Sequence, residues 1–156
     1  MAEKAHAILS ASSSNRWLHC TPSALLAAQF PRTTSKYAEA GTLAHSIGEL
    51  KARKYFVEPM GPKDYQTRLN ALKESPYYDR AMDGNTDAYL DYLKGLSMSY
   101  GESAPFVALE VRVDYSRYVP DAFGTADCIM IGGDRMCVVD YKNGSGVQVD
   151  AENNSQ

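Results

Sequence analysis

Cysteine is scarce in this chain, and the shortage excludes several classes of protein. Only three cysteines occur among the 156 residues, namely Cys20, Cys128 and Cys137. An odd number of cysteines argues against a disulfide framework, and a four-cysteine zinc or iron–sulfur site needs one more than the chain holds. We expect Cys128 and Cys137 to be small buried apolar residues. For Cys20, which has no CxxC partner, an ordinary structural role is favoured over metal binding.

Long apolar runs and an excess of positive charge are also missing. No stretch approaches the roughly eighteen apolar residues of a membrane helix, and the first six residues carry an acid and no apolar segment of the kind that a secretion signal needs. These features predict a cytoplasmic protein with no membrane partner. The 16 basic and 19 acidic residues give a net charge of −3. This balance argues against a non-specific DNA coat protein, but it allows an acidic centre that binds a cation before it meets phosphate.

Helical periodicity dominates the first 104 residues. After the possible N-cap residues Ser12–Ser14, the pattern predicts a helix that carries Trp17 and Leu18. The further predicted helices are Ser23–Phe30, Lys36–Phe56, Asp64–Ser75 and a long helix that follows Pro76. The Lys36–Phe56 helix has an apolar face made of Ala40, Leu43, Ala44, Ile47 and Leu50.

After Pro105 the apolar pattern changes to a period of two, which predicts strands. We expect one strand over Phe106–Tyr115 and a hairpin formed by Thr125–Ile131 and Arg135–Tyr141. The predicted fold class is therefore α+β, with N-terminal helices packed on a small mixed β-sheet of about three strands. Residues 1–156 form one predicted domain, with a helical part over 1–104, the sheet over 105–142 and a polar tail over 143–156.

The register of the hairpin decides whether two acids meet. If Gly133-Asp134 is the two-residue loop, the ladder places Asp127 opposite Asp140, with Cβ atoms about 5 Å apart. Lys142 projects from the same face as Asp140 because it lies two residues further on. Opposed carboxylates destabilise a sheet, so this arrangement predicts a cation site. If Gly132-Gly133 were the loop instead, Asp127 would face a valine and the argument would fail.

Other polar residues admit two interpretations. His45 lies beside the apolar face of its helix, four residues before Glu49, and a packed, hydrogen-bonded histidine is the favoured interpretation over a functional one. Glu110 belongs either to an acidic site or to an exposed face of its strand. The basic residues Lys51, Arg53 and Lys54 suit a solvated helix end better than a phosphate path. Core and rim packing is favoured over base stacking for the tyrosines between residues 77 and 100.

Several of these motifs, taken in order, resemble the PD-(D/E)XK nuclease superfamily, RecB-like branch. They are Gly41-Thr-Leu-Ala-His45, Gly124-Thr-Ala-Asp127 and Asp140-Tyr-Lys142. Glu110 and the opening segment, Ser10-Ala-Ser-Ser-Ser-Asn-Arg-Trp17 followed by Cys20-Thr-Pro22-Ser, also fit. The similarity therefore spans nearly the whole chain, and it is stronger still to phage- and prophage-borne members of the branch.

The resemblance implies a helix-flanked sheet that binds Mg²⁺ or Mn²⁺ and cleaves DNA. The implied ligands are Asp127, Asp140, the carbonyl group of Tyr141, and His45, with Glu110 as a further acidic contributor. Asp127, Asp140 and Lys142 are the implied catalytic residues. The ion would lower the pKa of a bound water, and Lys142 would orient that water or stabilise the transition state.

The chain departs from the superfamily pattern after the hairpin. Members continue into a helix with a Gln…Tyr motif and a further strand, whereas Gln156 is the final residue of this sequence. We expect the missing segment to leave an apolar sheet edge or face bare, which favours a homo-oligomer or a protein partner. The first functional hypothesis is a metal-dependent DNA nuclease. The alternative is a truncated nuclease-fold protein that acts by protein binding, such as a phage inhibitor of a host defence enzyme (anti-CRISPR-like).

Overall fold

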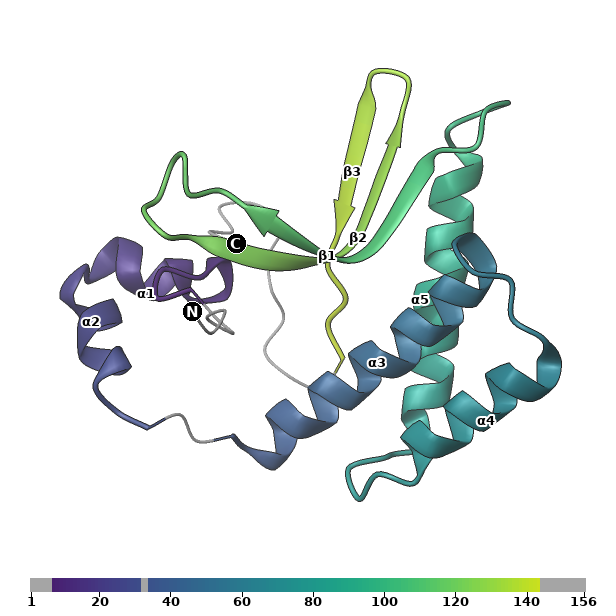
Figure 1. Cartoon of the computed structure of the whole chain (residues 1–156), viewed down its shortest axis with the longest axis horizontal. Helices are drawn as coiled ribbons and strands as arrows, with labels where there is room; N and C mark the ends of the chain where they lie inside the picture. Colours follow the sequence, from purple (N-terminus) through teal and green to yellow (C-terminus); the bar gives the residue numbers. More distant parts are fainter. Residues whose placement is uncertain (1–6, 32–33, 144–156) are drawn as a thin grey trace. The chain divides into compact units, whose positions relative to one another are not determined.

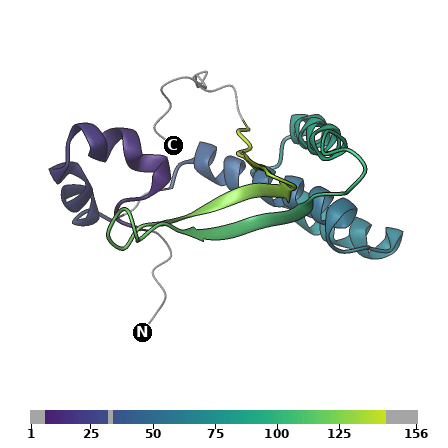
Figure 2. The same cartoon turned by 90° about the horizontal axis from the view of Figure 1, so that it is seen from above.

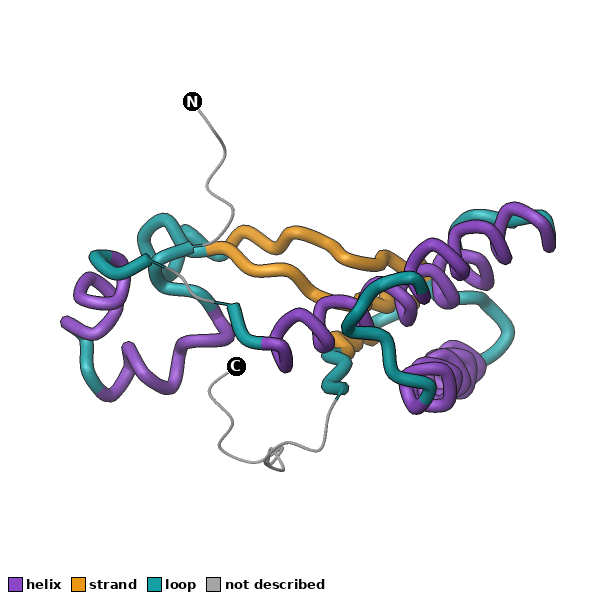
Figure 3. The backbone as a smooth tube through the Cα atoms, turned by 90° about the horizontal axis from the view of Figure 1, so that it is seen from below, coloured by secondary structure: helices purple, strands orange, loops and turns teal. Residues whose placement is uncertain are grey.

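The computed structural model describes residues 7–31 and 34–143. Over these residues the chain forms a short 3-10 turn, five α-helices and three β-strands, in that order (Figure 1). Figure 3 shows the helices in purple and the strands in orange. The α+β class and the three strands are therefore confirmed. The described residues group into two compact units, one of residues 7–31 and 112–125 and the other of residues 34–111 and 126–143. The single domain stays a prediction.

The first unit contains the N-terminal helices and the outer ends of two strands. The 3-10 turn Ala11–Ser13 leads into α1 (Ser14–His19), and α2 (Pro22–Ala28) begins with a proline, whose missing N–H costs nothing at that position. Trp17 Nε1 donates to the carbonyl of Ser10 at 3.0 Å. The Tyr115 hydroxyl lies 3.4 Å from the carbonyl of Leu9 and 3.3 Å from that of Phe123. These hydrogen bonds connect the N-terminal turn with the strand ends.

The second unit is built on three helices, α3 (Lys36–Phe56), α4 (Pro62–Lys73) and α5 (Ala81–Met98). Helix α3 has the predicted bounds because the Ser35 hydroxyl caps it, accepting from Ala38 N at 3.2 Å. Its predicted apolar face is buried against α5, which lies beside it (Figure 1). Gly48 permits this close approach, because a Cβ atom there would lie 3.2 Å from the Tyr89 ring.

The three strands form one sheet in the order β1-β2-β3, with β1 (Phe106–Asp114) beside β2 (Phe123–Gly132) (Figure 2). The sheet is antiparallel, not mixed as predicted. β2 pairs with β3 (Arg135–Val139) in the register that follows from a Gly133-Asp134 loop, from Gly132↔Arg135 to Cys128↔Val139. Gly133 has a φ of 58°, as the first position of a primed hairpin turn requires. The alternative loop is therefore wrong.

The two faces of the sheet in the second unit have different surroundings. Cys128 and Met130 are fully buried in the core that α3 and α5 form, as expected for Cys128, whereas Cys137 is only half-buried. The opposite face carries large apolar side chains in solvent. We call this set the bare sheet face: Phe106, Ile131, Met136 and Val138, which are 66%, 43%, 64% and 59% exposed.

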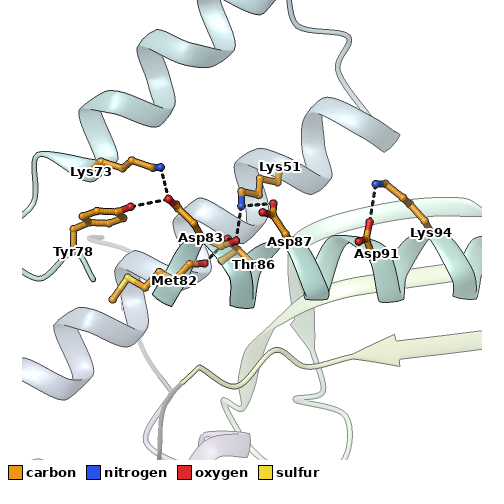
Figure 4. Close-up of polar contacts among 9 residues, drawn as sticks. All are labelled: Lys51, Lys73, Tyr78, Met82, Asp83, Thr86, Asp87, Asp91 and Lys94. Atoms are coloured by element: carbon orange, nitrogen blue, oxygen red, sulfur yellow. Dashed lines mark hydrogen bonds and ion pairs between the residues drawn. The ribbon is translucent and has the colours of Figure 1, made fainter. Parts of the chain in front are cut away.

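A polar network ties the three helices of this unit together (Figure 4). Lys51 on α3 is buried, and its ammonium group donates to the carbonyl of Asp83 at 2.9 Å and to Asp87 Oδ1 at 2.5 Å. Lys73 and the Tyr78 hydroxyl both donate to Asp83 Oδ2, at 2.7 and 2.8 Å. The favoured placement of Lys51 on a solvated helix end was therefore wrong, because acceptors on α5 compensate its burial. Within the described part of the chain, none of the helices has both the length and the apolar character that a membrane crossing requires.

Candidate functional site

Three polar side chains from three elements converge beside the end of the hairpin. His45 lies on α3, Glu110 on β1 and Asp127 on β2, and one ligand atom from each lies within 4.8 Å of the other two. His45 Nδ1 is 3.3 Å from Asp127 Oδ1. The backbone N–H of Tyr141 donates to Asp127 Oδ2 at 2.6 Å. Each of the three residues is half-buried, and we call His45, Glu110 and Asp127 the buried half of the site.

The neighbouring residues in the sequence explain the positions of His45 and Asp127, whereas Glu110 has a strained backbone. His45 directly follows Ala44 on α3, and Asp127 directly precedes Cys128 on β2, so fully buried neighbours fix both backbones. Glu110 has a φ of 51°, which side chains other than glycine seldom adopt. This conformation interrupts the alternation of β1. It turns Glu110 toward the other two residues at a cost of about 1–2 kcal/mol, and such strain is concentrated at functional sites.

Charge interactions within the buried half shift the pKa values of His45 and Asp127 in opposite directions. The hydrogen bond with Asp127 raises the pKa of His45 above its ordinary 6.5, although burial opposes this shift. Burial alone would raise the pKa of Asp127, but the hydrogen bonds from His45 and from the Tyr141 N–H outweigh it and lower that pKa below 3.8. The structure thus favours an imidazolium–carboxylate pair.

Glu110 has a different electrostatic environment. Burial, followed by the nearby carboxylates of Asp127 and Glu49, raises its pKa, and His45 and Arg53 oppose that rise only in part. Glu49 itself accepts a hydrogen bond from Arg53 Nε at 3.1 Å, one helical turn further along α3. Glu49 therefore binds Arg53, and His45, which lies four residues before Glu49 on the same helix, pairs with Asp127. The surplus of carboxylates around His45 favours a bound cation.

Asp140 and Lys142 form what we call the exposed half of the site. The inferred opposition of Asp127 and Asp140 is corrected by the structure, since the ladder ends at Cys128↔Val139 and Asp140 lies just beyond it. Asp127 accepts from the Tyr141 N–H at this point, where the predicted ladder had placed a second carboxylate opposite it. Asp140 instead binds Lys142, with Oδ2 2.9 Å from Nζ, and the two side chains are 57% and 56% exposed.

Lys142 links the two halves electrostatically. Its charge lowers the pKa of both His45 and Asp127. Asp140 does not belong to the group of three residues whose ligand atoms converge, so its role as a metal ligand stays a prediction. The same holds for the carbonyl group of Tyr141.

The side chain of Tyr141 was not expected to contribute to the site. Its ring stacks on that of Tyr89 from α5, with ring centroids 4.7 Å apart, and lies 5.3 Å from the His45 ring. Both tyrosines are buried, and burial raises the pKa of each hydroxyl. Tyr89 is one of the tyrosines between residues 77 and 100, for which core and rim packing was the favoured interpretation, and that interpretation did not indicate its proximity to the site.

The donor set of the buried half suits a hard divalent cation. It offers one imidazole nitrogen and carboxylate oxygens from two residues, and oxygen ligands are preferred by Mg²⁺ and Mn²⁺. Ligands on opposite sides of such an ion lie about 4.2 Å apart, so atoms within 4.8 Å of one another can contact a single ion after small movements. His45 would have to be neutral to bind it.

A family comparison applies to almost the whole chain. Residues 6–156 match the family described as "Protein of unknown function (DUF2800)". The chain belongs to the DUF2800 family. No solved structure matches it.

This DUF2800 chain has an open pocket of about 580 Å³ next to the site. One wall is formed by α5 and the other by the end of β3 and the residues that follow it. The lining residues are Asn85, Ala88, Tyr89, Tyr92 and the segment 138–142. The pocket therefore contains the exposed half of the site, and Tyr141 belongs to its wall.

Proposed function

We propose that this protein is a metal-dependent DNA nuclease with a PD-(D/E)XK-like core. The observation that carries the proposal is the convergence of His45, Glu110 and Asp127 within 4.8 Å, with the Lys142 ammonium close enough to influence two of them. A structural histidine–aspartate pair would not require a strained glutamate beside it. Metal-dependent phosphodiester hydrolysis uses a cation next to a positive side chain, and these residues would supply both.

The chain's own residues would divide the work as follows. His45, Glu110 and Asp127 would hold Mg²⁺ or Mn²⁺, and Asp140 would join them by exchanging its partner Lys142 for the ion. A bound ion would activate a water molecule and offset charge on the scissile phosphate. The freed Lys142 would donate hydrogen bonds to the phosphate or to the attacking water. The exchange is easy because an exposed ion pair contributes little, about 0–1 kcal/mol.

Cleavage of DNA with and without Mn²⁺ tests this proposal. We expect the wild type to cut linear single- or double-stranded DNA, EDTA to stop it, and Lys142→Ala to lower the rate by about 100-fold or more. Lys63→Ala is the matched control, because Lys63 is an exposed lysine on α4. Equal rates for the wild type and Lys142→Ala would contradict the role of Lys142.

The bare sheet face supports the second candidate function, protein binding. Four large apolar side chains are exposed on one side of the short hairpin and its neighbouring strand. Such a patch favours association with a second copy or with another protein, as in a phage factor that blocks a host defence enzyme. Light scattering during gel filtration should show a dimer or larger species that Met136→Glu reduces to a monomer. A monomeric wild type at high concentration would contradict self-association.

Two further proposals concern the setting of this activity. A nuclease that acts on host or phage DNA would work in the cytoplasm. The resemblance of the His45, Asp127 and Asp140-Tyr-Lys142 motifs supports a phage or prophage source.

A further inference from the structure

The pocket beside the site combines an aromatic wall with a polar rim. Asn85, Ala88, Tyr89 and Tyr92 follow the i, i+3, i+4, i+7 spacing, so they occupy one side of α5 and face the segment 138–142. The volume of about 580 Å³ lies in the range of pockets that hold small ligands. These residues therefore form one continuous surface, and the pocket has room for a planar group.

The aromatic wall has a closed part and an open part. Tyr89 and Tyr141 are buried and stacked on each other at 4.7 Å, so each ring already has an aromatic neighbour. Tyr92, one helical turn beyond Tyr89, is 60% exposed. An exposed tyrosine ring in a pocket wall offers a face on which another planar ring can stack.

The polar rim carries groups that suit a nucleotide. Asn85 presents a side-chain amide, which now donates to Asn143 Oδ1 at 3.0 Å, and amides read the edges of bases. Lys142 presents an ammonium group whose partner is the exposed Asp140. An incoming phosphate can replace that partner, because exposed ion pairs are weak.

The polar network described above holds α5 in place, and it lies on a different side of α5 from the pocket. Asp83 and Asp87 hold Lys51 and Lys73 (Figure 4). The period of 3.6 residues per turn places both aspartates more than a quarter-turn away from Asn85 and Tyr92 around the helix axis. Because these contacts anchor α5 to α3 and α4, the pocket wall is preorganised, which lowers the entropic cost of binding.

We propose that this pocket binds one unpaired nucleotide of a DNA strand, with the base stacked on Tyr92 and the adjacent phosphate at Lys142. The inference rests on the proposed function, because Lys142 belongs to both. A base inside a duplex is covered on both faces by its neighbours, so only a single-stranded or flipped-out base can stack on Tyr92. The pocket thus selects single-stranded or frayed DNA as the substrate.

Binding without cleavage tests this inference separately from the nuclease activity. The probe is a fluorescent oligothymidylate of about ten nucleotides, titrated with the full chain in EDTA and followed by anisotropy. We expect Tyr92→Ala to weaken binding by about tenfold or more and Tyr92→Phe to bind as the wild type does. Tyr37→Ala is the control, since Tyr37 is an exposed helical tyrosine outside the pocket lining. A closed hairpin duplex of the same charge should bind more weakly than the single strand.

The possible outcomes separate the two claims. If Tyr92→Ala binds the single strand as tightly as the wild type, or if the duplex binds equally well, the nucleotide pocket is wrong even where Mn²⁺-dependent cleavage is observed. If the wild type fails to bind the oligonucleotide at all, the pocket is also wrong. If Tyr92 is required for binding but no Mn²⁺-dependent cleavage is found, the pocket stands and the nuclease proposal fails.

Discussion

Each half of the candidate site pairs an acidic side chain with a basic one. The buried half holds its pair in fixed positions, whereas the pair in the exposed half is free to separate. Asp127 accepts hydrogen bonds from the Tyr141 N–H and from His45, and its side chain is only 11% exposed. Asp140 forms a direct ion pair with Lys142 at the protein surface, with more than half of each side chain exposed. The buried half is therefore a fixed frame, whereas the exposed half can change partners.

This difference assigns different roles to residues of similar chemistry. A buried carboxylate with fixed donors sets the position of a cation, because its orientation is determined before the ion arrives. An exposed lysine can follow a phosphate as charge develops on it. We therefore expect substitutions in the buried half to change both stability and cation affinity, and substitutions in the exposed half to leave stability almost unchanged.

The proposed catalytic role of Lys142 in the exposed half predicts the greatest change. Lys142→Ala should slow DNA cleavage by about 100-fold or more while changing the free energy of unfolding by less than about 0.5 kcal/mol. Rate measurements beside urea denaturation give both numbers. Substantial destabilisation by this substitution would show that the exposed half is also a structural element, and the comparison would fail.

The next prediction compares how much the protein is destabilised when either aspartate is replaced by alanine. Asp127→Ala leaves the Tyr141 N–H without its acceptor and His45 without its ion pair, so it should destabilise the fold by about 2 kcal/mol. Asp140→Ala should cost less than about 0.5 kcal/mol. Urea denaturation of the two variants provides the measurement. Equal destabilisation would contradict the division into two halves.

A smaller effect concerns pH. Because the pKa of His45 is raised, the charged imidazole contributes fully to the free energy of unfolding below about pH 6.5. This contribution is lost as the pH rises through the pKa in the folded protein. The lowered pKa of Asp127 means that its contribution is present above about pH 3.8 and is lost at more acidic pH. The difference in stability between the wild type and His45→Gln should therefore be largest between these values, at about 1 kcal/mol. A difference that is constant from pH 4 to pH 9 would show that the pair does not titrate as described.

The smallest effect measures the coupling between the halves. Since the charge of Lys142 lowers the pKa of His45, Lys142→Met should raise that pKa, and added salt should weaken the effect. Proton NMR titration of the imidazole measures it directly, and Lys63→Met serves as the control. An unchanged His45 pKa would place Lys142 too far away to share a phosphate with the cation.

The sequence predicted the frame of the site because local signals determine it. The Ser35 cap and the apolar face define Lys36–Phe56, and the Gly133-Asp134 loop with its alternating flanks defines the hairpin register. His45, Asp127 and Lys142 could therefore be assigned to neighbouring elements. The prediction of a cation site at this end of the hairpin remains a prediction, now with a specific geometry.

Contacts between distant segments could not be read from the sequence. Glu110 adopts a positive φ that strand periodicity does not reveal, and this conformation brings it to His45 and Asp127. Lys51 is buried because Asp87, thirty-six residues further along the chain, accepts from it. The Tyr141 N–H takes the place expected for Asp140, since strand pairing ends one residue earlier than the pattern indicates. In each case tertiary packing determined the outcome.

Calorimetric titration with Mn²⁺ shows whether the buried half holds a divalent cation, as we propose. The titration should be run near pH 8, because loss of the His45 proton favours metal binding, on the wild type, Asp127→Asn, Glu110→Gln and the turn control Asp134→Asn. We predict that the wild type and Asp134→Asn bind one ion per chain, and that each of the other two variants loses about tenfold or more in affinity. Wild-type affinity in both Asp127→Asn and Glu110→Gln would contradict the account.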